Sequence, residues 1–107
     1  YRVTLGSGET LTIEVSSLNH DVDESIYLID ACPEDGTTFE PFTDNCVIGA
    51  DNELWDSASE TFSFSHSDAE SKDYFVVVDA YCFGTETDYS SHCPTSIDQF
   101  YLTWSIQ

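Results

Sequence analysis

The sequence predicts an all-β domain, an antiparallel β-sandwich of about seven or eight strands. Strand-forming valine, threonine, tyrosine and phenylalanine are frequent, whereas strong helix formers are scarce and methionine is absent. Several segments alternate apolar and polar residues, which is typical of half-buried strands, and none has a helical period of useful length. The 107 residues suffice for a single domain, residues 1–107, with one modest core.

In the first half of the chain, the expected strands cover residues 1–5, 10–16, 25–30 and 46–50. The first two strands flank the turn Gly6–Glu9, and this pattern predicts a β-hairpin. Its inward face is expected to consist of Tyr1, Val3, Leu5, Leu11, Ile13 and Val15. The segment from Ser17 to Glu24 is predicted to be a polar loop. The nearly continuous apolar run in residues 25–30 predicts a strand that is covered on both faces.

In the second half, the expected strands cover residues 60–66, 74–81 and 99–106. Phe62 and Phe64 should point inward from the first of these strands, and residues 74–81 should form a central strand. The last strand places Phe100, Leu102, Trp104 and Ile106 on one face. Seven such strands with acidic loops between them predict two packed sheets.

The chain is strongly acidic, with a net charge of −19 from 21 acidic residues and only two basic ones, Arg2 and Lys72. Nucleic acid and anionic membranes are therefore unfavourable partners. No apolar run has the roughly 18 residues that a membrane-spanning helix needs, so membrane insertion is not expected. The acidity fits either a solubilising surface for salty or extracellular surroundings or divalent cations bound at acidic loops.

The four cysteines form two local pairs, Cys32 with Cys46 and Cys82 with Cys93, and each pair brackets a polar loop. Four cysteines permit three connectivities, and the local one closes two loops, each worth about 3 kcal/mol in the entropy model. Two disulfides of this kind suit a small domain outside the cytoplasm, and free cytosolic thiols are the alternative. The spacing does not fit a zinc knuckle or a redox motif.

The order of the segments "YRVTLGSGETLTIEV", "ESIYLIDAC", "CVIGADNE", "ETFSFSH", "YFVVVDAY" and "FYLTWSI" resembles the bacterial pre-peptidase C-terminal domain family. The resemblance spans nearly the whole chain. It implies a jelly-roll-like β-sandwich, without catalytic activity, appended to secreted or cell-surface bacterial proteins. Some members, including collagen-binding modules, bind calcium or a polymeric substrate.

The resemblance also implies a calcium site near the acidic position before the third strand. Asp23 is the best candidate on this basis, followed by Asp21, Asp51 and Asp79, and a solvated acidic loop is the alternative. The chain departs from the family in lacking the strand that precedes "YRVTL". That strand would come either from flanking residues of a longer exported chain or from a neighbouring molecule by strand addition.

No residues form a convincing catalytic group. Ser65, His66 and Asp68 compose a triad only on paper, since neighbouring residues of a strand point apart. Aromatic residues outside the expected core, notably Trp55, Tyr81 and Tyr89, could bind an extracellular polymer or a protein. We therefore expect a non-catalytic accessory module that contacts flanking domains or a polymer. A subunit of an extracellular filament or surface assembly is the alternative.

Overall fold

The computed structural model describes residues 1–17, 22–31, 45–51, 59–82 and 100–107, without the side chains of residues 17, 22, 23 and 80–82. The elements are β1 (Arg2–Leu5), β2 (Thr10–Ser17), β3 (Val22–Ile29), β4 (Cys46–Ala50), β5 (Ser59–Ser65), β6 (Lys72–Cys82) and β7 (Phe100–Ile106). These seven strands confirm the predicted all-β class. The described part of the chain contains no helix of the length and apolarity needed to cross a membrane.

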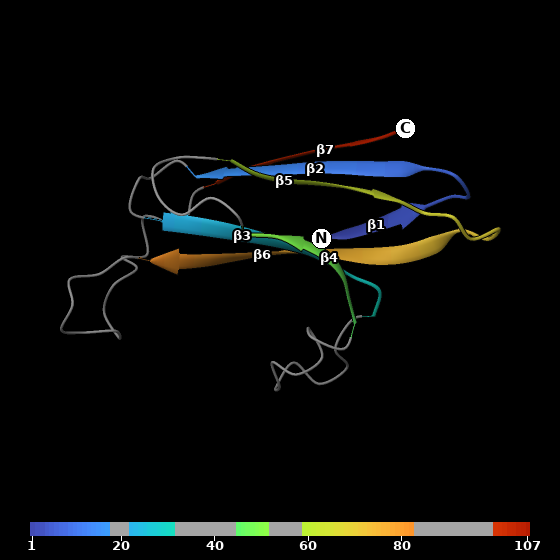
Figure 1. The fold of residues 1–107 in the computed structure, drawn as a ribbon, viewed down its shortest axis with the longest axis horizontal. Coiled ribbons are helices and arrows are strands. Elements are labelled where there is room, and N and C mark those ends of the chain that lie inside the picture. Colours follow the sequence, from blue (N-terminus) through green and yellow to red (C-terminus); the bar gives the residue numbers. More distant parts are fainter. Residues whose placement is uncertain (18–21, 32–44, 52–58, 83–99) are drawn as a thin grey trace.

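The strands form two antiparallel sheets that lie face to face (Figure 1). One sheet has four strands in the order β1-β6-β3-β4, and the other has three in the order β5-β2-β7. Across the interface, β2 packs over β3, and β5 packs over β3 and β4. The predicted central strand is confirmed, because β6 pairs with β1 on one edge and with β3 on the other.

The predicted hairpin of residues 1–16 is wrong. β1 pairs with β6, whereas β2 pairs with β5 and β7, so the turn at Gly6–Glu9 carries the chain from one sheet to the other. Gly8 has a φ of 77°, a conformation that glycine adopts without steric cost. The alternation of apolar residues could not reveal this crossing, because both strands point their apolar faces into the same interior.

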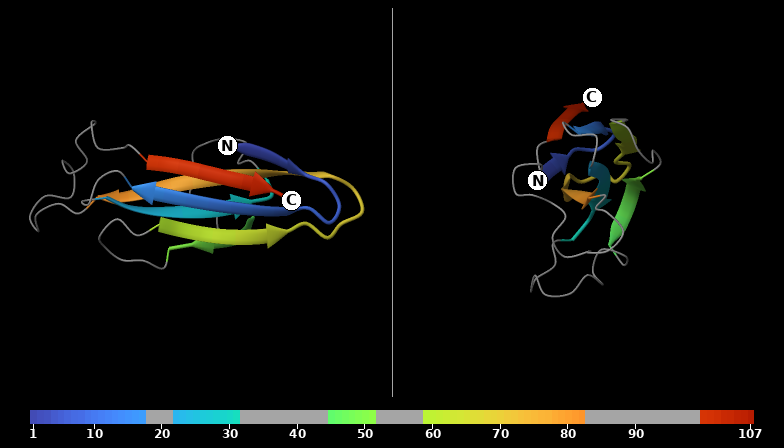
Figure 2. Two further views of the ribbon diagram at one scale, coloured as in Figure 1. Left: turned by 90° about the horizontal axis from the view of Figure 1, so that it is seen from above. Right: turned by 90° about the vertical axis from the view of Figure 1, so that its left-hand side faces the viewer.

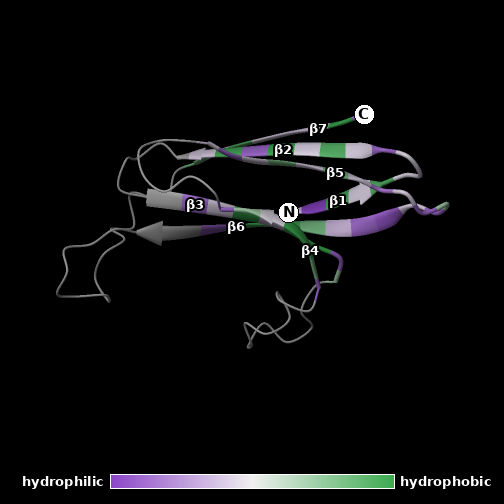
Figure 3. Ribbon diagram, viewed as in Figure 1, coloured by the Kyte–Doolittle hydropathy of each residue, from purple (hydrophilic) through white to green (hydrophobic). Residues whose placement is uncertain are grey.

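The core lies between the two sheets. Its buried apolar side chains are Leu5, Leu11, Ile13, Val15, Ile26, Leu28, Ala50, Phe62, Tyr74 and Val76. The alternation that places them inward can be followed along β2 in Figure 3. The predicted inward faces of residues 1–16 and 60–66 are confirmed at these positions. Tyr1 is an exception, since 64% of it is exposed.

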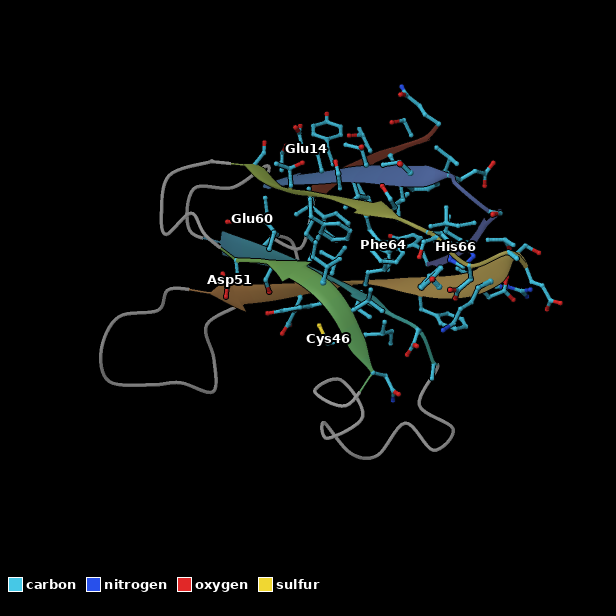
Figure 4. All side chains as sticks on the ribbon, turned by 45° about the vertical axis from the view of Figure 1, so that its right-hand side comes forward. Glu14, Cys46, Asp51, Glu60, Phe64 and His66 are labelled. Atoms are coloured by element: carbon cyan, nitrogen blue, oxygen red, sulfur yellow. The ribbon has the colours of Figure 1, made fainter. Side chains whose placement is uncertain are left out.

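The outer face of the sheet β5-β2-β7 is almost uncharged. Hydroxyl pairs join β2 to β5 across this face at 2.7–2.9 Å: Thr10 with Ser65, Thr12 with Ser63, and Ser16 with Ser59. Glu14, labelled in Figure 4, is the only charged residue at the outward positions of the three strands. This face therefore differs from the acidic composition of the chain as a whole.

Within the part of the chain that the structure describes there is no disulfide. Cys46 is exposed and bonded to no other cysteine, so the predicted bond to Cys32 is not formed here. The residue directly opposite Cys46 is Ile29, and Asp30 donates its N–H to the Asn45 carbonyl at 3.1 Å. Cys32 and Cys93 lie outside the described residues, as does the side chain of Cys82, and both pairings remain predictions for the oxidised protein.

The crossing turn is tied to the end of β5 by His66, which is 1% exposed. The His66 backbone accepts from the Gly8 N–H and donates to the Glu9 carbonyl, both at 2.9 Å. Its Nε2 lies 2.7 Å from the Glu70 carbonyl, which can only accept. In the neutral ring, Nδ1 therefore accepts from the Tyr74 hydroxyl at 2.8 Å.

Replacing His66 by phenylalanine is expected to destabilise the domain by about 1–3 kcal/mol, because the Glu70 carbonyl and the Tyr74 hydroxyl lose their partner. Tyr74→Phe alone leaves Nδ1 without its donor. The double variant should cost less than the sum of the two single variants, since the hydroxyl and the nitrogen are removed together. Urea unfolding of the four proteins measures this coupling, and additive losses would contradict the network.

Candidate binding site on the open side of the domain

Two strand edges are free on the same side of the domain. Among the described residues, β1 pairs only with β6, and β7 pairs only with β2. Because β2 packs over β3, the sheets continue outward as β7 and β6, and β1 is then the strand that has no counterpart. The views in Figure 2 place β1 and β7 on one side. We call this region, formed by residues 1–5 and 100–106, the open side.

Apolar side chains are uncovered at the open side. Phe100 and Leu102 pack against the core as predicted, but Trp104 and Ile106 are 55% and 39% exposed. The Tyr1 ring lies 6.3 Å from the Trp104 ring, centroid to centroid. The prediction of one common face along β7 is therefore confirmed, while the expected burial of its last two members is wrong. The reason is that no strand of the three-stranded sheet lies beyond β7 to cover them.

The backbone of β7 presents unpaired groups to the open side. Thr10 and Gln107 exchange both of their hydrogen bonds, at 2.8 and 3.0 Å. Because bonded and non-bonded pairs alternate in an antiparallel ladder, Ser105 and Thr103 also bond to β2. The N–H and C=O groups of Leu102, Trp104 and Ile106 then point away from β2. An extended segment could pair with them.

β1, which forms the floor of the open side, is held to β6 by polar contacts with Asp73. The Thr4 hydroxyl donates to Asp73 at 2.6 Å, and the Arg2 guanidinium lies 2.6 Å from the same carboxylate. The Thr4 hydrogen bond, followed by the Arg2 contact, lowers the pKa of Asp73 below its ordinary value of 3.8. The contact is solvent-exposed, so its contribution to stability is small.

These contacts predict a pH dependence. A lowered pKa in the folded state means that the stabilisation by Asp73 is present above the pKa of the unfolded carboxyl and is lost as the pH falls through the folded pKa. Asp73→Asn should therefore lower the melting temperature slightly at pH 7, and the difference from the unaltered chain should vanish near pH 2. Thermal unfolding followed by circular dichroism measures this. A difference that is constant with pH would contradict the assignment.

The predicted calcium ligands are only partly described. Asp79 lies opposite Ser25 on β3, and Asp51 follows Ala50, which lies opposite Ile26. Asp51 and Asp79 thus flank β3 in one row, two strand spacings or about 9–10 Å apart. Asp21 and the side chain of Asp23 lie outside the described residues. The described part of the chain contains no group of three potential metal ligands, and the calcium site stays a prediction.

The predicted aromatic binding residues cannot be compared with the open side. Trp55 and Tyr89 lie outside the described residues, and Tyr81 is described only by its backbone, opposite Asp23 in β6. The paper triad is not assembled. The Ser65 hydroxyl pairs with Thr10 on the outer face, whereas His66 points into the interior (Figure 4).

Two buried carboxylates were not predicted. Glu24 and Glu60 are 5% and 3% exposed, and each has at least one polar interaction. Glu24 shares the inward phase of Ile26 on β3, and Glu60 shares that of Phe62 on β5. The position of Glu60 two residues before Phe62 was a usable signal. Glu24 was assigned to a loop, because strand prediction disfavours the acidic run Asp23-Glu24.

No protein-family model matches the chain, and neither the curated proteins nor the solved structures compared with it include a significant match.

Proposed function

We propose that the chain is a non-catalytic accessory module of an exported bacterial protein that binds an extended polypeptide segment on its open side. In this proposal the two sheets form a jelly-roll-like β-sandwich that the bound segment completes as an eighth strand. The observation that carries the proposal is the free edge of β7 beside the uncovered Trp104 and Ile106. A sheet edge with unpaired backbone groups and an adjacent apolar surface is the usual setting for strand addition.

The strand β7 supports this function through what it lacks. Natural proteins protect exposed edges with charged residues, proline or bulges. The sequence Phe-Tyr-Leu-Thr-Trp-Ser-Ile of β7 contains no charged residue and no proline, in a chain with 23 charged residues elsewhere (21 acidic plus two basic). The printed register between β2 and β7 is also regular over its whole length. The edge is therefore open to pairing.

The extracytoplasmic setting rests on the cysteines and on the resemblance to pre-peptidase C-terminal domains. Disulfides are expected to close the loops 32–46 and 82–93 in an oxidising compartment. The second candidate function, a subunit of an extracellular filament, draws on the same free edge, because strand addition also joins the subunits of an assembly.

Amide hydrogen exchange tests the binding function. The probe is an uncharged, end-capped peptide of seven alternating threonine and valine residues, which matches the length of β7. The outward amides of Leu102, Trp104 and Ile106 should exchange fast in the free chain and become protected when the peptide binds. A peptide of the same sequence with every amide N-methylated should give no protection, since it cannot donate hydrogen bonds. Unchanged exchange with the first peptide would refute the proposed function.

A further inference from the structure

The chemistry of the open side indicates what kind of segment binds there, and this inference rests on the proposed function. A strand added beside β7 would have alternate residues on its two faces. Those on the inner face would lie over β1 and beside Trp104 and Ile106, where apolar side chains are uncovered. Those on the outer face would continue the surface of Thr103 and Ser105, where only Glu14 carries a charge. The complementary segment therefore alternates apolar and uncharged polar residues.

The edge of a second copy does not fit this place. The open position is the one beside β7 and over β1, since the four-stranded sheet is one strand wider than its partner. If the β7 of another copy paired with this β7, that copy would bring its own four-stranded sheet under its β7. That sheet would meet β1 in the same space, about 10 Å below the added strand. A single strand with no sheet beneath it has no such collision.

The charge of the chain selects further. Both basic side chains already have acidic partners: Arg2 lies 2.6 Å from Asp73, and Lys72 lies 2.9 Å from Asp30. The remaining net charge of −19 repels an acidic segment, or a second copy of this chain, and attracts a basic one. β7 itself is uncharged, so this selection acts on the flanks of the added strand and not on its centre.

We propose that the segment bound beside β7 is a single extended strand from a separate polypeptide, with alternating apolar and hydroxyl residues at its centre and basic residues at its flanks. The strand hydrogen-bonds to the outward backbone groups of Leu102, Trp104 and Ile106. Its apolar residues cover Trp104 and Tyr1. The negative field of the domain accelerates its association and favours it over acidic competitors.

Fluorescence titration of residues 1–107 tests this inference. Trp55→Phe makes Trp104 the only tryptophan of the chain, because the sequence contains two. Two peptides share the same alternating threonine-valine centre and differ only in their flanks, two lysines or two glutamates at each end. Each is titrated at about 0.01 M and at about 1 M salt, where the Debye length is about 30 Å and about 3 Å.

The lysine-flanked peptide is expected to shift Trp104 emission to the blue and to bind at least roughly tenfold more tightly than the glutamate-flanked peptide at low salt. The difference should shrink strongly at high salt. Equal binding of the two peptides at low salt would overturn the charge selection while leaving the proposed function standing. Binding of neither peptide, together with unchanged amide exchange, would overturn both.

Two further results would overturn the assigned occupant. Trp104 emission that is already blue in the free chain and does not respond to peptide would mean that another segment of this chain fills the place. A dimer in size-exclusion chromatography with light scattering, dissociated by the lysine-flanked peptide, would assign the place to a second copy. With the proposal correct, the free chain is monomeric at all concentrations tested.

Discussion

Replacing Ser105 by proline is expected to destabilise the domain by about 2 kcal/mol or more, because the Ser105 N–H bonds to β2 and its loss leaves a ladder acceptor unpaired. The same replacement one residue later, Ile106→Pro, should change stability by less than about 1 kcal/mol, since proline is tolerated where the N–H faces away from the sheet. Urea unfolding of the two variants measures the contrast.

The same pair separates stability from binding. Ile106→Pro removes an outward donor and places the proline ring on the free edge, so it should abolish the protection that the threonine-valine peptide gives to β7. Ile106→Val is the matched control, because it keeps the donor and most of the apolar surface. Equal destabilisation by the two prolines would show that the alternation of bonded and free groups along β7 is assigned incorrectly.

Leu11→Ala is expected to cost about 2–5 kcal/mol, a large part of the 5–15 kcal/mol that stabilises a typical domain. Leu11 is fully buried and lies in β2 between Phe64 of β5 and Ile106 of β7, so its loss leaves a cavity at the centre of the three-stranded sheet. Thermal and urea unfolding measure the loss.

Thr12→Ala is the control for Leu11→Ala, because it lies on the same strand but faces outward. It removes one hydroxyl of the exposed pair with Ser63 and should change stability by less than about 1 kcal/mol. Equal losses at the two positions would contradict the placement of the core between the sheets.

Strand positions were predictable where alternation and composition agree. The expected strand 46–50 coincides with β4, and residues 60–66 and 99–106 differ from β5 and β7 by one residue at an end. β3 begins at Val22, before the predicted Ser25, because its first turn of sequence, Val22 to Glu24, contains acidic residues that usually avoid strands. There the ladder with β6, a contact between distant residues, decides the structure.

Strand partners were not predictable in the same way. Gly6–Glu9 connects two strands in the pattern of a hairpin, yet β1 and β2 belong to different sheets. Local sequence specifies a reversal of direction in both cases, because the interior lies between the sheets and both strands must face it. Which edge β1 joins depends on β6, more than sixty residues away by the register of Val3 with Tyr74.

The open side shows the same division. Sequence by itself determined that Phe100, Leu102, Trp104 and Ile106 share one face, since side chains of a strand alternate with a period of two. Only the tertiary structure decided that Trp104 and Ile106 remain exposed, because burial depends on whether a strand of the opposite or the same sheet covers that face. The sequence determined the faces of each strand; the unequal width of the two sheets, a property of long-range pairing, left one of those faces uncovered.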